Sequence, residues 1–245
     1  TSCNNEPMYI DFIPIFVKAW KKLYPNVDVK IILIHDCIPE TFKEYEKNII
    51  LFPPLPNVST AFTSQYIRLL YPALLSYTNG VMITDMDILP MNKTYFTEHI
   101  KSLDNDTFIY LRENICFKYK EIAMCYNVAL PTVWKDIFHI TSLKDIKDRI
   151  NSVFQNNIII EGHGNEGWST DQKDLYTYVS KWNTITNKFI CLKETDTRFK
   201  RLDRNTFMLS KQLKQMIQLG IFSDYHCYRP YTQFKDINDI IVSWL

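Results

Sequence analysis

Two aspartates one residue apart, Asp85 and Asp87, are the side chains of this sequence whose type and spacing most directly indicate chemistry. They lie in the segment 80–90, whose apolar, branched residues are typical of a buried strand. Because side chains alternate along a strand, both carboxylates should point to the same side where the strand ends. Two like charges there are costly unless a cation or ordered hydrogen bonds neutralise them. The pattern favours a hard metal ion with a phosphate-bearing substrate. The alternative is a turn in which Asp85 caps the next helix and Asp87 is solvated.

The composition is that of an ordinary globular protein. The chain has 245 residues, of which 46% are hydrophobic and 22% charged, and a formal net charge of +1, so no binding to nucleic acid is expected. No apolar stretch approaches the roughly 18 residues that a membrane span needs. The six cysteines form no C-x-x-C pair, which favours reduced, packed thiols. We expect a soluble domain in the cytoplasm, with the Golgi lumen as the alternative, and leave the oligomeric state open.

The order of the predicted elements indicates an α/β fold. Strands are expected at residues 29–35, 48–52, 107–112 and 123–130, and in the apolar run from Gly80 that ends at the two aspartates. Helices are expected at 14–24 and 93–103, and a third should begin at Ser59 or Thr60 and be kinked by Pro72 or end near it. Further helices should begin at Pro131 and at Ser142, with Asp145 at the capping-box position. Repeated βα units before the aspartates predict a mostly parallel sheet with helices on both faces. The second half is less regular and no linker divides the chain, so residues 1–245 are expected to form a single domain.

A glycine-rich segment precedes the next candidate carboxylate. Three of the five glycines fall in E-G-H-G-N-E-G-W (161–168). Such a loop lets a ligand approach the backbone closely, and a mobile surface loop is the alternative. It runs into Ser169 and Gln172, which have the spacing of a capping box. Asp171 then has two interpretations: a carboxylate favoured in the first helical turn by the helix dipole, or a group that faces a ligand.

Several segments together resemble metal-dependent glycosyltransferases of the GT-A fold. The segments S-Q-Y-I-R (64–68), G-V (80–81) and T-D-M-D-I-L-P (84–90) are similar to the S-D-x-x-R helix, the glycine turn and the D-x-D strand of that superfamily. Its members include the bacterial toxin glucosyltransferases. The segments C-Y-N-V-A-L (125–130) and D-Q (171–172) are similar to glycogenin-like and galactosyltransferase-like members. The resemblance covers residues 1–230 and implies a nucleotide-sugar-binding half, 1–112, and an acceptor-side half, 113–245.

The resemblance also implies a metal site and a donor site. Asp87 would bind Mn²⁺ or Mg²⁺ directly, and Asp85 would bind the metal and approach the ribose. His226 would complete the metal site, because D-Y-H-C-Y-R-P-Y (224–231) is similar to the H-x-x-G-x-x-K-P-W segment of retaining members. In that segment Arg229 would meet the diphosphate. Thr1, Ser2 and Asn4, at the end of the presumed first strand, are candidates for the base and ribose. The full set expected to contact the nucleotide sugar is Thr1, Ser2, Asn4, Ser64, Arg68, Asp85, Met86, Asp87 and Arg229.

The function that these residues predict is transfer of a sugar from a nucleotide diphosphate sugar, with a UDP-sugar favoured, to a hydroxyl group of a glycan or protein-linked acceptor. Asp171, near the reacting carbon, and Arg68 are the expected catalytic residues. Asp171 would be the acceptor base in an inverting reaction, or would position the sugar and stabilise an oxocarbenium-like state in a retaining one. Trp168 and His163 would shape the sugar or acceptor pocket. The D-Q pair and the segment around Arg229 favour retention of configuration. Many relatives carry Asp at the position of Gln65, so the identity of the sugar stays open.

Two other functions are compatible with the motif. Phosphohydrolases of the haloacid-dehalogenase type also begin from a strand that ends in D-x-D. That family places the motif on its first strand, whereas two strands are expected before it here. The second alternative is a non-catalytic relative that binds a nucleotide sugar without turning it over.

Overall fold

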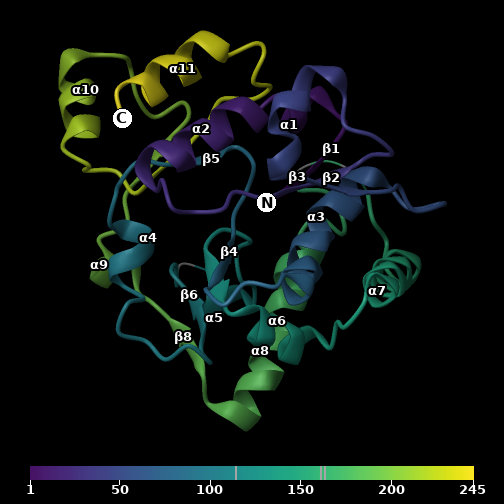
Figure 1. Cartoon of the computed structure of the whole chain (residues 1–245). Coiled ribbons are helices and arrows are strands. Elements are labelled where there is room, and N and C mark those ends of the chain that lie inside the picture. The colour runs from purple at the N-terminus through teal and green to yellow at the C-terminus, as the bar shows by residue number, and fades with distance from the viewer. Residues whose placement is uncertain (114, 161, 163) are drawn as a thin grey trace.

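Helices lie on both sides of short β-strands in this α/β fold, with the N-terminus near the middle of the molecule (Figure 1). The computed structural model describes residues 1–113, 115–160, 162 and 164–245. Within these residues the strands form three sheets, of three, four and three strands. The predicted α/β architecture is confirmed, while the sheet is more divided than the expected single, mostly parallel one. No helix in these same ranges has the length and apolar character to cross a membrane.

The direction of the strands changes along the chain. The first sheet is parallel and contains β1 (Ser2–Asn4), β2 (Ile31–Ile34) and β3 (Ile49–Phe52). The second has the order β4 (Val81–Ile83), β7 (Asn127–Ala129), β6 (Phe108–Tyr110) and β8 (Phe189–Cys191), and only β6 and β8 pair in parallel. The third pairs β10 (Asp224–His226) antiparallel with β5 (Ile88–Pro90) and parallel with β9 (Arg201–Asp203).

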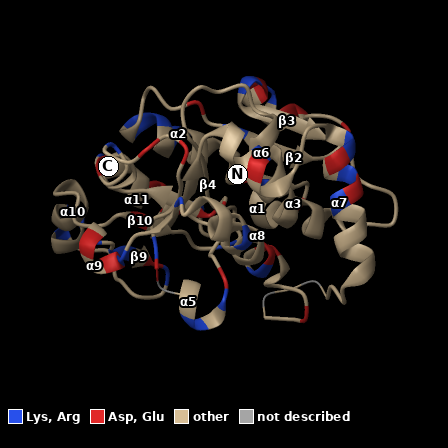
Figure 2. Cartoon of the chain, turned by 90° about the horizontal axis from the view of Figure 1, so that it is seen from below, with Lys and Arg blue, Asp and Glu red and all other residues tan. Residues whose placement is uncertain are grey.

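The helices vary widely in length. They are α1 (Pro7–Ile10), α2 (Ile13–Leu23), α3 (Thr60–Leu70), α4 (Tyr95–Glu98), α5 (Cys116–Tyr119), α6 (Pro131–Phe138), α7 (Leu143–Asn156), α8 (Thr170–Thr186), α9 (Glu194–Thr197), α10 (Lys211–Gln218) and α11 (Lys235–Ser243), with 3₁₀ turns η1 (Glu40–Asn48) and η2 (Tyr71–Leu74). Helix α7 lies at the surface and carries charges of both signs (Figure 2).

Strand β2 shows why the sheet needs helices on both faces. All four of its side chains are buried. Ile31 and Leu33 belong to a hydrophobic cluster that includes residues of α2, whereas Ile32 and Ile34 belong to a second cluster that includes residues of α3, α6 and α8. Alternating side chains of one strand therefore reach two separate cores, as expected for a strand that is covered on both faces.

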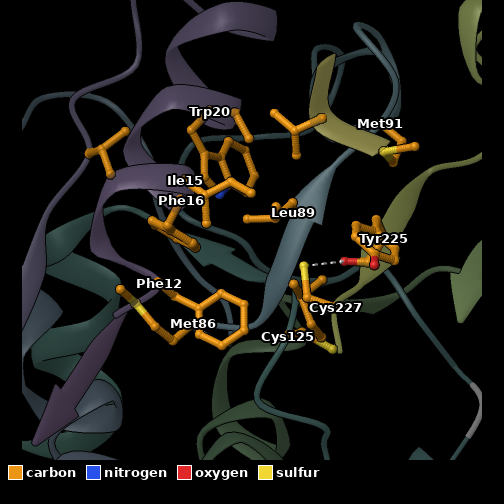
Figure 3. Close-up of a cluster of buried hydrophobic side chains, with 14 of the residues drawn as sticks. Phe12, Ile15, Phe16, Trp20, Met86, Leu89, Met91, Cys125, Tyr225 and Cys227 are labelled. Carbon is orange, nitrogen blue, oxygen red and sulfur yellow. Dashed lines mark hydrogen bonds between the residues drawn. The ribbon is translucent and has the colours of Figure 1, made fainter. Parts of the chain in front are cut away.

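The cluster around α2 reaches the second half of the chain. Figure 3 shows Leu89 of β5 beside Phe16 and Trp20 of α2. Tyr225 of β10 is fully buried in the same cluster. Because β5 pairs with β10, this packing joins the N-terminal helix to the C-terminal strand. This hydrophobic cluster therefore contains residues from both halves of the chain.

The chain changes sheets at the two aspartates. Strand β4 ends at Ile83 in the second sheet, and β5 begins at Ile88 in the third. Asp85 and Asp87 therefore lie shortly after the end of β4, where a strand end was expected, and the second strand, β5, was not expected. The amide of Ile88 donates to the carbonyl of Asp85 at 3.4 Å, which turns the chain at this point.

Most of the other predicted elements are present, with different lengths. Helix α7 has the predicted capping box, in which the side chains of Ser142 and Asp145 both accept backbone bonds. Helix α3 ends at Leu70, and Pro72 lies in the 3₁₀ turn that follows. The helix expected at 93–103 covers only Tyr95–Glu98. The polar run 104–106, D-N-D, favours turns over a continued helix.

A buried ion pair joins β9 to β10. Arg201 donates from Nε and Nη2 to the carboxylate of Asp224, with the shortest contact at 2.6 Å. Asp224 is fully buried, and it also accepts a hydrogen bond from Tyr126 Oη. A carboxylate without access to water depends on these partners, because its charge has no other compensation.

Replacement of Asp224 with Asn should therefore lower the free energy of unfolding by about 3–5 kcal/mol, because Arg201 would keep a buried charge without its partner. Chemical denaturation of purified protein measures this difference. The matched control is Asp148→Asn in the exposed pair with Lys144, which should leave the midpoint almost unchanged. A loss for Asp224→Asn no larger than that of the control would contradict the role of the buried pair.

Candidate functional site

The residues predicted to do chemistry meet in a cavity of about 330 Å³, which we call the polar cavity. Of the predicted set, Ser2, Asn4, Ser64, Gln65, Arg68, Asp85, Met86, Asp87, Trp168, Asp171, Gln172, His226 and Arg229 line it. Met86 is 3% exposed and its side chain belongs to the cluster around α2, so it offers the cavity little polar chemistry. Thr1 lines a different cavity.

That second, apolar cavity is larger, at about 500 Å³, and shares Arg68 with the first. Its walls include Thr1 beside β1, residues of β4, and Phe16 and Trp20 of α2. Neither Asp85 nor Asp87 is among the described residues that line it. The smaller, polar cavity is therefore the candidate site, because it contains the charged groups.

Helix α3 supplies one wall of the polar cavity. Its N-cap residue Ser59 accepts a hydrogen bond from the amide of Phe62. Ser64 and Arg68, one turn apart, both face the cavity. The strand β1 is tied to this helix, because Ser2 Oγ donates to the carbonyl of Ser64. Asn4 Nδ2 also donates to Thr60 Oγ1 at 3.2 Å, so these two side chains are already engaged with α3.

Asp87 is surrounded by positively charged and hydrogen-bonding groups. Its Oδ2 lies 3.3 Å from His226 Nε2, 3.2 Å from Arg204 Nη1 and 3.3 Å from Arg229 Nε. Burial by itself raises the pKa of this carboxyl group, but the hydrogen bond from His226 and the charges of Arg229 and Arg204 outweigh it and lower the pKa to about 2. Asp87 is therefore a buried carboxylate that stays ionised.

His226 is oriented by a second carboxylate that sequence reasoning missed. Its Nδ1 lies 2.9 Å from Asp203 Oδ1, at the end of β9, and its Nε2 faces Asp87. A ring held in this way presents one nitrogen to the cavity, which is the arrangement that carboxylates impose on histidines that bind metals. The parallel pairing of β9 with β10 sets His226 opposite Asp203, and the sequence alone gives no register for these strands.

Asp85 has a different environment. Its side chain is 32% exposed and forms an ion pair with Arg68 Nη1. Arg68 is buried, and it also donates to the carbonyl of Thr84 at 3.4 Å and lies 3.5 Å from Asp171 Oδ2. Burial lowers the pKa of the guanidinium, but the two carboxylates outweigh it, so the pKa rises. Arg68 is thus a buried residue of α3 that joins Asp85 to Asp171.

Asp171 is 2% exposed and is held in place from one side. Its Oδ1 accepts hydrogen bonds from the amide of Gln172 at 2.9 Å and from Gln65 Nε2 at 3.4 Å. Its Oδ2 has no hydrogen-bond partner among the described residues, although Arg68 lies nearby. A buried carboxylate oxygen without a partner beside a cavity is where a ligand hydroxyl group or cation would fit. The predicted capping box does not form, because the side chain of Ser169 makes no cap bond.

Burial raises the pKa of Asp171 to about 7, and the nearby negative charge of Asp85 adds to this effect. The positive charge of Arg68 acts in the opposite direction but is shared between both carboxylates. A raised pKa of Asp171 is expected, because the one guanidinium is shared between the buried Asp171 and the partly exposed Asp85 and cannot compensate both fully. Asp171 and Asp87 therefore differ in pKa within one cavity.

The glycine-rich loop reaches the cavity through Trp168. The carbonyl of Trp168 accepts a hydrogen bond of 2.6 Å from Gln65 Nε2, which joins the loop to α3. Gly167 has φ +83°, and a Cβ atom there would lie 2.5 Å from the carbonyl oxygen of Ile158, so only glycine fits. Glu161 and His163 lie outside the described residues, and the predicted role of His163 stays a prediction.

The three predicted metal ligands are not gathered into one cluster. In the ranges that the structure describes, no group of three or more His, Cys, Asp and Glu side chains is arranged to hold a metal ion. Asp87 and His226 adjoin, whereas Asp85 is paired with Arg68. A carboxylate and an imidazole nitrogen that is oriented by Asp203 nevertheless suit Mn²⁺, and carboxylates suit Mg²⁺. The donor set therefore fits a divalent metal at Asp87 and His226, with Asp85 as the third ligand if it exchanges its partner.

Comparison with known proteins shows the fold. No family model matches the sequence, and no curated protein matches it. Among solved structures, galactosyltransferase LgtC, in complex with donor and acceptor sugar analogues, is similar to this chain with a TM-score of 0.50 and 12% identity, covering 100% of this chain and 94% of LgtC. An active-site mutant of LgtC has a TM-score of 0.48 and 11% identity, with 92% and 85% covered. The chain therefore has the GT-A fold, as predicted.

The environment of Asp171 predicts how stability depends on pH. Its pKa is higher in the folded protein than the usual value near 4 of an unfolded chain, so folding favours the protonated form. This contribution is complete below about pH 4 and is lost as the pH rises through about 7. The stability of the wild-type protein should therefore fall more steeply between about pH 5 and about pH 8 than the stability of Asp171→Asn. Denaturant titrations at both pH values measure the difference, and parallel pH profiles would contradict it.

Proposed function

We propose that the protein is a metal-dependent glycosyltransferase that transfers a sugar from a UDP-sugar to a hydroxyl group of a glycan or protein-linked acceptor. The observation that carries this proposal is that two buried carboxylates of different character, Asp87 and Asp171, line the same cavity of a GT-A fold. Solved structures of that fold include a galactosyltransferase with donor and acceptor sugar analogues. The cavity volume of about 330 Å³ is sufficient for part of a nucleotide sugar.

The Asp87 side of the cavity suits the diphosphate. A Mn²⁺ or Mg²⁺ ion bound by Asp87, His226 and Asp85 would neutralise the negative charge that develops on the leaving group. Arg204 and Arg229 lie beside Asp87 and can donate charge-assisted hydrogen bonds to phosphate oxygens. Protein groups that are fixed before the reaction stabilise this charge without reorganisation in the transition state.

The Asp171 side suits the sugar that is transferred. Asp171 Oδ1 is fixed by Gln172 and Gln65, so the free oxygen Oδ2 has a defined position. We assign it to the reacting end of the sugar, where a carboxylate stabilises positive charge at the anomeric carbon. Arg68 holds Asp171 in position relative to Asp85. Transfer with retention of configuration is the outcome that we propose.

The other two candidate functions differ in what they bind and release. A phosphohydrolase would hydrolyse simple phosphate esters without a nucleotide, and the GT-A fold disfavours that reading. A non-catalytic relative would bind a nucleotide sugar without turnover for any acceptor. Thermal-shift measurements with a panel of nucleotide sugars, with and without Mn²⁺, test the proposal first. We expect a stabilisation that requires both the metal and one particular donor.

Replacement of Asp87 with Ala should abolish Mn²⁺-dependent hydrolysis or transfer of the donor sugar, because the metal loses the buried carboxylate that anchors it. Release of UDP measures the activity, and circular dichroism verifies the fold. Asp148→Asn on the exposed face of α7 is the matched control and should keep full activity. Full activity of folded Asp87→Ala would overturn the proposed metal site.

A further inference from the structure

Two arginines of the polar cavity have no part in the proposed chemistry. Arg112 follows β6 and Arg201 begins β9, so two different sheets bring them to the cavity. A guanidinium nitrogen of each lies 3.8 Å from Cys125 Sγ. Two cations therefore approach the same buried thiol on the cavity wall.

Both guanidinium groups are held by residues that do not line the cavity. Arg112 Nε donates to Glu194 Oε1 at 2.9 Å, and Arg201 is bound by Asp224. The ring centroid of Phe199 lies 4.2 Å from Arg112 Cζ and 5.5 Å from Arg201 Cζ. These three partners, Glu194, Asp224 and Phe199, are not among the described residues that line the cavity. The two side chains are therefore rigid and present positive charge to the cavity.

Each guanidinium group has one nitrogen that makes no hydrogen bond to a described residue. Arg112 uses Nε and Nη1, and Arg201 uses Nε and Nη2, in their hydrogen bonds to described residues. Nη2 of Arg112 and Nη1 of Arg201 have no such bond among those residues. Because the two like charges repel each other, an anion that accepts hydrogen bonds from both would be favoured at this position.

We propose that Arg112 and Arg201 form an anion subsite that selects a carboxylate or phosphate group on the transferred sugar or on the acceptor. This inference rests on the proposed function and specifies its substrate class. A neutral hexose would leave Nη2 of Arg112 and Nη1 of Arg201 without an anionic acceptor, although Glu194 and Asp224 pair with the other nitrogens. Sites with donors of this kind discriminate against ligands that lack the matching group. If the two arginines only hold the fold together, neutral and anionic ligands will bind equally.

The first experiment compares donors by calorimetry in the presence of Mn²⁺. Wild-type protein should bind UDP-glucuronate at least about tenfold more tightly than UDP-glucose if the anion belongs to the donor sugar. If the two donors bind equally, protein saturated with UDP and Mn²⁺ should bind glucose 6-phosphate about tenfold more tightly than glucose, which places the anion on the acceptor. Equal binding in both comparisons overturns the subsite.

Arg112→Gln is the variant that tests the residues. Glu194 is 34% exposed on its side chain and can be hydrated when Arg112 is lost, whereas the loss of Arg201 would strand the buried Asp224. The ratio of anionic to neutral affinity should fall to within about twofold of unity, a change of at least about fivefold. Lys118→Gln on α5, an exposed cation outside the described cavity lining, is the control and should keep the wild-type ratio.

Arg112→Lys gives a second, milder change. Lysine keeps the positive charge but lacks the planar guanidinium group, so the ratio of anionic to neutral affinity should lie between those of the wild type and Arg112→Gln. This variant also tests the subsite if Arg112→Gln does not fold. A wild-type ratio in folded Arg112→Gln overturns the assignment of the residues. Failure of every nucleotide sugar to bind with Mn²⁺ would instead overturn the proposed function, and the subsite with it. Binding of a neutral donor, with no preference for the anion in either the donor or the acceptor comparison, would overturn the subsite alone.

Discussion

The buried guanidinium of Arg68 is the interaction on which the geometry of the polar cavity depends. It joins α3 to Asp85, in the connection between β4 and β5, and to Asp171, in the first turn of α8. Three elements that are far apart in the sequence thus meet at one charge. Since an unpaired charge at this depth is costly, the position of each carboxylate constrains the other. Gln65, one turn before the same region of α3, adds a neutral link to Asp171 and to the loop at Trp168.

Asp87 and Asp171 line the same cavity, but their surroundings shift their pKa values in opposite directions. Asp87 has three donors around one oxygen, which lower its pKa to about 2, whereas Asp171 shares one guanidinium and has a pKa raised to about 7. Environments that separate the pKa values of two neighbouring acids commonly give them different roles. A permanently ionised group is suited to a cation, and a group with an unpartnered oxygen is suited to a reacting ligand. This difference is the physical basis for assigning the diphosphate and the sugar to opposite ends.

Sequence patterns predicted most helices, strands and cavity residues, but not which strands pair with one another. Periodicity and apolar runs located α2, α3, α7 and the first strands, because these elements bury whole faces or stripes. The end of a strand at the aspartates was expected, but β5 in another sheet was not, since it arises from a change of partner strand. Arg112 and Arg201, which line the cavity, and Asp203, which orients His226 from behind it, were missed because the pairing of β6, β9 and β10 sets their positions. The spacing of Ser169 and Gln172 suggested a cap that the nearby carboxylate of Asp171 replaces.

Different parts of the chain tolerate sequence change to different degrees. The two cores require only apolar side chains at alternating positions, as in β2. Many sequences meet this requirement, so this chain can share the GT-A fold with LgtC at 12% identity. The charged groups of the cavity lie where strands end or change sheets, and there a side chain can be exchanged without loss of core packing. Arg112 occupies such a position, whereas Arg201 lies in β9 and is held by the buried Asp224; both contact Cys125 rather than the Asp87 or Asp171 groups. Selection among sugars or acceptors can therefore change at this wall while the carboxylates that define the chemistry stay in place.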